Sequence, residues 1–268
     1  MRVTWWGHST TTIEDAGTRV LTDPVLVDRL AHLRRRRGPT PTRQATRADA
    51  VVLSHLHADH THVASLRRLP AHTPVLAPRG ARALLDRVRG DLGDRCTEMD
   101  PGDAVVVGRL TIEAVPAAHD GRRHPWSRHE GPALGFVLTG ERSTYFAGDT
   151  DLHTGMDGLG PLDLALLPVG GWGPTLGDGH LDPVRAAEAA ERCRAAAVVP
   201  IHWGTLWPIG LDRVRPHLFD GPGDRFVEAV TARGLDTAVH VLQPGQAIDL
   251  PDTPEPDGPD EVGTREES

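Results

Sequence analysis

The sequence predicts a mixed α/β (α+β) fold in which helices cover the outer faces of β-sheets. Short β-rich runs bounded by Gly and Pro dominate the first half of the chain, and helical stretches then alternate with strands. The second half repeats this order. Because strands are followed by helices in each half, we expect sheets that are packed on one side against helices.

The first half contributes most of the predicted strands. β-rich runs lie at Val3 to Trp6, Thr10 to Glu14, Arg19 to Thr22 and Val51 to Ser54. Two helices flanking a strand at Pro74 to Ala77 are expected at Val63 to Leu69 and Ala81 to Val88. Two further strands lie near Ala104 to Val107 and Leu110 to Val115.

The second half continues with strands at Leu134 to Leu138, Thr144 to Ala147, Leu164 to Leu167 and Val198 to Ile201. A helix over Pro183 to Arg194 is expected, because Asp182 can cap its N-terminus and proline suits its first turn. The remaining elements are a helix at Asp224 to Ala232 and a last strand pair at Val239 to Leu242 and Ala247 to Leu250.

Length and composition predict one globular domain, residues 1–250, and a disordered tail, residues 251–268. A chain of 268 residues with 38% hydrophobic content can bury one sizeable core. The Pro-rich tail has seven acidic residues and one Arg, so it carries −6 of the formal net charge of −8. The body is then nearly neutral at −2, which argues against a nucleic-acid partner, because such proteins neutralise phosphates.

Cysteine usage and hydropathy predict a cytoplasmic protein. Cys96 and Cys193 lie far apart, so neither a disulfide scaffold nor a thiolate metal site is indicated. No apolar run approaches the ~20 residues that span a bilayer, and Met1 to Gly7 lacks the features of an export signal. We therefore expect no transmembrane segment.

The densest group of chemically active residues is the run His55-Leu56-His57-Ala58-Asp59-His60, directly after the apolar strand Val51 to Ser54. Imidazole and carboxylate are the ligands that borderline divalent metals prefer. In an extended segment His55 and His57 point to one side, so both can reach the same ion. A following turn would let Asp59 and His60 face a neighbouring ion.

Three more residues of ligand type follow predicted strands at a distance in the sequence. His119 comes after Leu110 to Val115, and Asp149 follows Gly148, which suits a tight backbone approach. His202 follows the strand that ends at Ile201. Strand ends are where a sheet gathers side chains into one site. Taken alone, each of these residues is explained equally well as a metal ligand or as an ordinary loop residue.

In this order the chain resembles the metallo-β-lactamase superfamily, whose pattern is H-x-H-x-D-H, a lone His, an Asp after a strand and a last His. The resemblance covers roughly Val3 to Leu250 and implies a four-layer αββα sandwich. It implies a first metal on His55, His57 and His119, and a second on Asp59, His60 and His202, with Asp149 bridging. Ligands without Cys suit two Zn²⁺ ions, although Mn²⁺ and Fe²⁺ are admissible.

Four local strings are most similar to the branch that includes N-acylphosphatidylethanolamine phospholipase D-like and ascorbate-6-phosphate lactonase-like proteins. They are Trp6-Gly7-His8-Ser9, Pro116-Ala117-Ala118-His119 with Arg122 following, His180-Leu181-Asp182-Pro183, and Ile201-His202-Trp203-Gly204-Thr205. His62 departs from the pattern, because related phospholipase-like sequences often have an acidic residue there.

The implied reaction is hydrolysis of a small phosphodiester, lactone or related ester by a hydroxide held between two metals. Asp59, His8 and His180 are the candidate catalytic residues. His8 and His180 lie in Gly-flanked loops and suit substrate contact or proton delivery, or else they orient a ligand or loop. No Gly-x-Ser-x-Gly turn or phosphate-cradling loop supports another mechanism.

Several alternatives stay open at this point. Arg122 and Arg123 either hold an anionic group of the substrate or are solvated. Tryptophans near the motifs either wall the substrate site or pack in loops; these are Trp126, Trp172, Trp203 and Trp207. The whole chain could also be a non-catalytic metal-binding or regulatory protein, an iron-dependent redox member of the superfamily, or a nuclease of this fold.

Overall fold

The structure is a computed structural model of the chain, and it describes residues 1–87 and 91–250. The expected tail, residues 251–268, and the end of the helix expected to reach Val88 lie outside the described residues.

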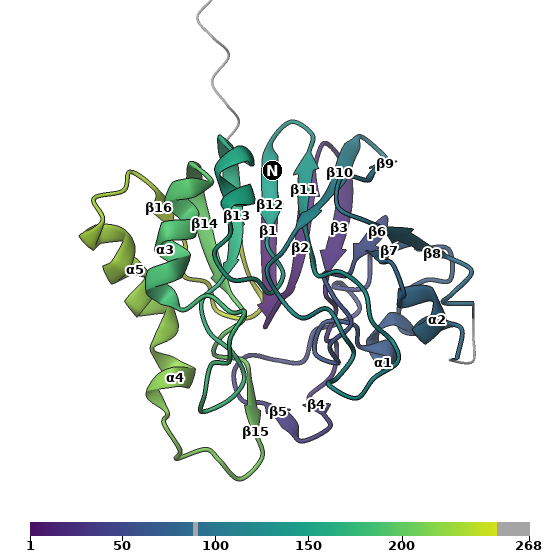
Figure 1. Cartoon of the computed structure of the whole chain (residues 1–268), viewed down its shortest axis with the longest axis horizontal. Helices are drawn as coiled ribbons and strands as arrows, with labels where there is room; N and C mark the ends of the chain where they lie inside the picture. Colours follow the sequence, from purple (N-terminus) through teal and green to yellow (C-terminus); the bar gives the residue numbers. More distant parts are fainter. Residues whose placement is uncertain (88–90, 251–268) are drawn as a thin grey trace, which may run out of the picture.

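Two seven-stranded sheets face each other at the centre of the molecule (Figure 1). The first sheet has the strand order β17 (Gln246–Asp249), β1 (Arg2–Gly7), β2 (Thr10–Asp15), β3 (Thr18–Thr22), β6 (Ala50–Val52), β7 (Val75–Pro78) and β8 (Cys96–Met99). The second has the order β16 (Ala238–Val239), β14 (Ala195–Ile201), β13 (Leu162–Pro168), β12 (Ser143–Phe146), β11 (Leu134–Thr139), β10 (Leu110–Pro116) and β9 (Ala104–Val107).

Helices cover both outer faces. On the side of the first sheet lie two short helices, α1 (Val63–Leu66) and α2 (Ala81–Leu85). Against the second sheet lie α3 (Pro183–Arg192) and α5 (Pro222–Ala232), with α4 (His217–Asp220) preceding α5 and the 3-10 helix η1 (Thr154–Gly158) preceding β13. The Asp182 side chain caps α3 as expected, because it accepts hydrogen bonds from the backbone N–H groups of Val184 and Arg185.

The side-chain alternation of the strands builds two apolar layers. In β3, Val20 belongs to the core between the sheets and Leu21 to the core under α1 and α2; Val52 and Val51 divide in the same way. All four are fully buried. The first sheet is therefore apolar on both faces in its middle strands, which explains why its sequence reads as continuous apolar runs.

The last two predicted strands do not pair with each other. The strand expected at Val239 to Leu242 is the two-residue β16, which pairs in parallel with β14. The strand expected at Ala247 to Leu250 is β17, which pairs antiparallel with β1 and so joins the other sheet. The expectation of a strand pair was wrong because both segments find existing sheet edges, one in each sheet.

A third, small sheet was not predicted. It consists of β15 (Leu206–Pro208), β5 (Leu33–Arg35) and β4 (Arg29–Leu30). Its strands are only two or three residues long, and β15 reaches β5 from more than 170 positions away in the sequence. Local patterns cannot show such a pairing.

The αββα metallo-β-lactamase sandwich expected from the resemblance is confirmed. Within residues 1–87 and 91–250, no helix combines the length and the apolar character that crossing a membrane requires.

Candidate metal centre

The candidate ligands come together because strands of both sheets end at the same edge of the sandwich. Each of the following residues stands one to three positions beyond the end of its strand: His8 after β1, Asp23 after β3, His55 after β6, His119 after β10, Asp149 after β12 and His202 after β14. The short loops beyond the strands then aim the side chains at one another. All seven ligands predicted from the sequence take part in the resulting clusters.

Three histidines form what we call the outer group: His55, His57 and His119. His57 Nδ1 lies 2.8 Å from His55 Nε2 and 3.2 Å from His119 Nε2. His55 is buried, whereas His57 and His119 are partly exposed. The nitrogens of three rings thus converge on one point at the solvent-facing end of the site.

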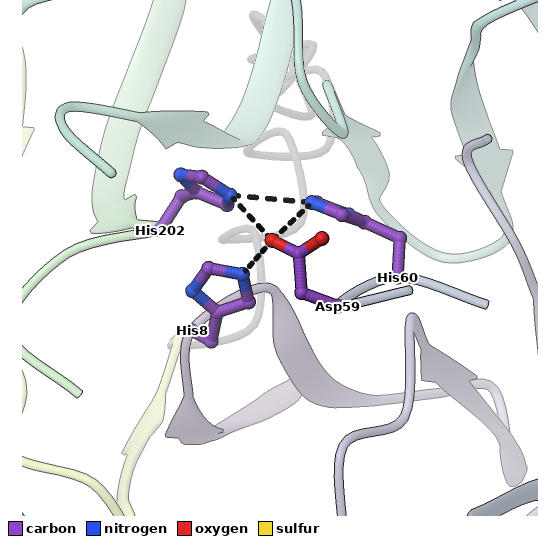
Figure 2. Close-up of side chains that lie close together, drawn as sticks. All are labelled: His8, Asp59, His60 and His202. Carbon is purple, nitrogen blue, oxygen red and sulfur yellow. Dashed lines mark hydrogen bonds and ion pairs between the residues drawn. The ribbon is translucent and has the colours of Figure 1, made fainter. Parts of the chain in front are cut away.

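Four residues form what we call the inner group: His8, Asp59, His60 and His202 (Figure 2). Asp59 Oδ2 lies 2.9 Å from His8 Nε2, 3.6 Å from His60 Nε2 and 3.8 Å from His202 Nε2. The His60 and His202 Nε2 atoms are 3.2 Å apart. All four residues are buried, in contrast to the outer group.

Asp149 connects the two groups. Its Oδ2 atom lies 3.2 Å from both His60 Nε2 and His202 Nε2, and it forms a further cluster with His55 and His60. Its Oδ1 atom is buried and has no hydrogen-bond partner among the described residues. A buried carboxylate oxygen without a partner is costly, and a bound cation is one of the few ways to satisfy it.

Hydrogen bonds behind the rings fix how the histidines present their lone pairs. The Nδ1–H of His119 donates to the carbonyl of Gly179 at 2.8 Å, and that of His202 donates to the carbonyl of Gly170 at 2.8 Å. In a neutral imidazole the Nε2 atom is then an acceptor and faces the site. This backing by carbonyls is the arrangement found behind metal-binding histidines.

The charges differ between the groups. Burial lowers the pKa of His55 well below its usual value, and it lowers the pKa of His57 to about 4. Burial also opposes a proton on His60, but the carboxylates of Asp149, Asp59 and Asp23 outweigh it and raise the pKa of His60. Neutral rings in the outer group leave nitrogen lone pairs free for a cation.

Asp23 is a candidate functional residue that was not predicted from the sequence. Its carboxylate is fully buried, and Oδ2 lies 2.7 Å from His60 Nδ1 and 2.5 Å from Ser54 Oγ. Oδ1 accepts a hydrogen bond from the backbone N–H of Ser54 at 2.8 Å. The signal that could have found it was present, because Asp23 follows an apolar strand just as the ligands do.

The loop that contains the motif, His55 to His60, is also held by Arg123, which follows a strand of the second sheet. Nη1 of Arg123 donates to the carbonyls of Leu56 and Thr61 at 2.8 and 2.7 Å, so this arginine braces the segment between them. Arg122 instead pairs with Asp120 at 3.2 Å on the surface. The adjacent arginines, which the sequence could not separate, have different surroundings.

Backbone conformation at the site is constrained at two histidines. His8 and His202 both have positive φ, +53° and +61°, which is uncommon for residues other than glycine. The two segments contact each other directly, since the N–H of His202 donates to the carbonyl of His8 at 3.0 Å. Gly148 has φ +61°, and a Cβ there would lie 2.4 Å from that of Ser54. Glycine therefore allows Asp149 to approach the motif.

The remaining predicted residues divide between the site and the scaffold. His180 lies at the site, with Nε2 3.5 Å from Asp149 Oδ2 and its ring 4.6 Å from that of His119. His62 bonds to Ser65 Oγ at the start of α1 and belongs to none of the ligand clusters of the described residues.

The tryptophan wall was not found. Trp203 and Trp207 are buried, and Trp203 stacks on Trp5 with ring centroids 5.9 Å apart. Trp126 is 88% exposed. The partly buried Trp172 packs edge-on against His32. The two buried rings therefore pack in the protein interior and offer no surface to a substrate.

The donor set fits metal ions. Seven imidazoles and two carboxylates crowd around one small volume, and each ligand cluster has its donor atoms within 4.8 Å of one another. Nitrogen lone pairs that face each other, together with a partnerless carboxylate oxygen, are unfavourable without a cation between them. The hard and borderline donors, without sulfur, suit zinc, manganese or iron.

Comparison with known proteins agrees with this geometry. The family model of the Beta-lactamase superfamily domain matches residues 18–203. The chain belongs to the β-lactamase superfamily. The matched segment of this superfamily protein includes every predicted ligand, from His55 to His202.

Individual relatives align with most of this chain. It is 30% identical to the N-acyl-phosphatidylethanolamine-hydrolyzing phospholipase D 1 of Caenorhabditis elegans, over 86% of this chain and 70% of that protein. It is also 30% identical to a metal-dependent hydrolase of Methanopyrus kandleri, over 93% of this chain and 100% of that protein. The predicted resemblance to the phospholipase D-like branch is thereby confirmed.

A solved structure shows the same fold. The isothiocyanate hydrolase from Delia radicum gut bacteria superposes with a TM-score of 0.71 at 19% identity, covering 93% of this chain and 99% of that one.

Proposed function

We propose that this β-lactamase superfamily protein is a hydrolase that holds two divalent cations, Zn²⁺ in the first instance. The outer group and the inner group would each hold one ion, as the sequence motif suggested, and Asp149 would contact both. The single observation that carries this proposal is the position of the Asp149 carboxylate. Its carboxylate lies 3.2 Å from His60 and His202 of the inner group, it shares ligand clusters with His55 and His119 of the outer group, and its Oδ1 atom is buried without a partner among the described residues.

Two divalent cations bound there would acidify a water molecule and polarise a carbonyl or phosphoryl oxygen. Hydrolysis of an ester adds the oxygen of water to the acyl carbon or phosphorus, breaks the bond to the leaving oxygen and transfers a proton to it. The substrates we propose are a small phosphodiester, a lactone or a related ester. A superfamily relative that is named a metal-dependent hydrolase supports the reaction class.

The two extra histidines have different roles in this proposal. His180 is partly exposed and lies beside Asp149, so it can touch a substrate and is the candidate for handling the proton of the leaving group. His8 is 1% exposed, and its Nε2 atom lies 2.9 Å from Asp59 Oδ2. We therefore assign His8 as a positioning residue that holds Asp59, and Asp59 as a ligand that orients the reacting water.

Metal analysis tests the site directly. Protein purified without added metal should contain about two equivalents of transition metal per chain. The double variant His57→Ala and Asp59→Ala removes one ligand from each group, so its metal content should fall sharply. A control with His72→Ala and Asp94→Ala changes the same residue types at exposed positions and should keep the metal.

A substrate screen tests the activity. The metal-loaded protein is assayed with phosphodiesters, lactones and thioesters, and His180→Ala is compared with the wild type. Loss of proton transfer should lower turnover about 10²- to 10⁴-fold, most strongly for poor leaving groups, with both metals retained. An unchanged metal content in the ligand double variant would remove the basis of the proposal.

A further inference from the structure

A cavity of about 340 Å³ adjoins the candidate metal centre on the side of His180. Its walls come from the loop that follows β13, from the first turn of α3 and from α4 and α5. His180 belongs both to this wall and to a ligand cluster with His119 and Asp149. A group attached to a substrate at the metal centre could therefore enter the cavity directly.

The wall of the cavity combines apolar and charged side chains. Its apolar side chains are Val169, Leu176, Pro183, Leu218 and Pro222. Among its charged side chains, Arg185 forms an ion pair with Asp151 and the Asp182 carboxylate caps α3, whereas Asp178 and Arg225 line the cavity at exposed positions. Gly170 and Gly171 contribute no side chain, which leaves the space open.

A second hollow lies on the other side of the metal centre and has a different character. It has a volume of about 710 Å³ and includes His119 in its lining. Its wall contains four charged side chains, those of Arg79, Asp120, Arg122 and Glu130. The cavity beside His180 is smaller and more enclosed than this hollow, so it removes an apolar group from water more completely.

We propose that the cavity beside His180 binds a compact aliphatic acyl group and so selects esters or lactones of short- to medium-chain acids. This proposal rests on the proposed hydrolase function and adds its substrate class. The volume lies at the lower end of the range for small-molecule sites, so the acyl chain that fits is limited in length. Each methylene that enters the apolar space adds ~0.8 kcal/mol of binding, which is about fourfold in kcat/KM.

Gly171 is the position from which to fill the cavity. A Cβ at Gly171 would meet the Cδ1 atom of Leu176 at 3.3 Å, a contact that a flexible side chain can relieve. Gly171 is not among the glycines with positive φ, so a side chain is compatible with its backbone. Gly171→Val should therefore shorten the cavity without disturbing the ligands.

Leu176 is the position from which to enlarge it. Leu176 lines the cavity and is 37% exposed, so Leu176→Ala should remove a wall without opening the core. Leu211 offers a matched control, because it is also 37% exposed and is not part of the cavity lining. Leu211→Ala should leave the substrate preference unchanged.

The experiment measures kcat/KM of the metal-loaded protein for p-nitrophenyl acetate, butyrate, hexanoate and decanoate. In the wild type we expect a rise of about fourfold per methylene that ends when the cavity is full. Gly171→Val should move the optimum to a shorter chain, so the ratio of kcat/KM for hexanoate to kcat/KM for acetate should fall, and Leu176→Ala should move the optimum to a longer chain.

Binding without turnover gives a second measurement. Calorimetric titration with hexanamide should show binding to the wild type and to Leu211→Ala, and binding at least about tenfold weaker to Gly171→Val. Hydrolysis that does not depend on chain length, or one equal rate loss for all esters in Gly171→Val, would overturn the cavity proposal alone. Cleavage of phosphodiesters without cleavage of any carboxylic ester would also overturn the cavity proposal, whereas failure of the metal-loaded protein with every ester, lactone and phosphodiester would overturn the hydrolase function on which it rests.

Discussion

The outer and inner groups have similar donors but are built in different ways. Two of the three outer histidines, His57 and His119, are partly exposed, and the outer group is held by loops, such as the Gly179 carbonyl behind His119. The inner residues are buried and are held by a second layer of buried polar groups, in which Asp23 and Ser54 stand behind His60. The outer group therefore depends on local loops, whereas the inner group depends on the packing of the whole sandwich.

Replacing one histidine in each group should give the largest difference. His60→Ala leaves the buried carboxylate of Asp23 without its imidazole and removes one of the imidazoles beside Asp149, so the free energy of unfolding of the metal-free protein should fall by about 3 to 5 kcal/mol. His119→Ala removes a partly exposed ring and should leave that stability nearly unchanged while lowering metal content. Denaturant titration and elemental analysis measure both quantities. Equal destabilisation by the two changes would contradict the distinction between the groups.

Asp23→Asn tests the second layer behind the inner group. The substitution removes the charge opposite His60 Nδ1, and metal affinity of the inner site should fall about 10- to 100-fold. Asp15→Asn is the matched control, since Asp15 is also buried and accepts a hydrogen bond from the Arg142 backbone N–H, far from the site. Competition with a chelator measures the affinity. Weaker metal binding in both variants would point to a general loss of structure.

The adjacent residues Arg122 and Arg123 test how much the loops contribute to stability and to metal binding. Arg123→Ala removes two hydrogen bonds to the carbonyls that flank the motif, so stability should fall by about 2 kcal/mol and metal binding should weaken. Arg122→Ala removes a surface ion pair and should change stability by less than about 1 kcal/mol. The unfolding temperatures of both variants measure the change in stability. A larger effect at Arg122 would reverse this assignment.

The smallest effect is expected from deleting residues 251–268. Their composition, acidic and rich in proline, offers little apolar surface for a core, so both groups of ligands should keep their metals. Metal content, unfolding temperature and ester hydrolysis of the shortened chain should match those of the full chain. A marked drop in any of them would place the domain boundary beyond residue 250.

The sequence by itself was enough to predict the candidate ligands, both their types and their places. His55, His57, Asp59 and His60 were readable because four such residues within six positions follow an apolar strand. His119, Asp149 and His202 were readable because each follows a strand as well, and strand ends of one sandwich meet at one edge. Local periodicity also gave most strands and the capped helix α3, since these depend on neighbouring residues.

Only the tertiary structure decided which residues support the ligands and what surrounds them. Asp23 stands behind His60 across 37 positions, and the carbonyls behind His119 and His202 belong to distant loops. Likewise the separation of β16 from β17, the burial of Trp203 and the cavity beside His180 depend on contacts between segments far apart in the chain. A local pattern holds no information on such contacts, because their partners are brought together by the packing of the two sheets.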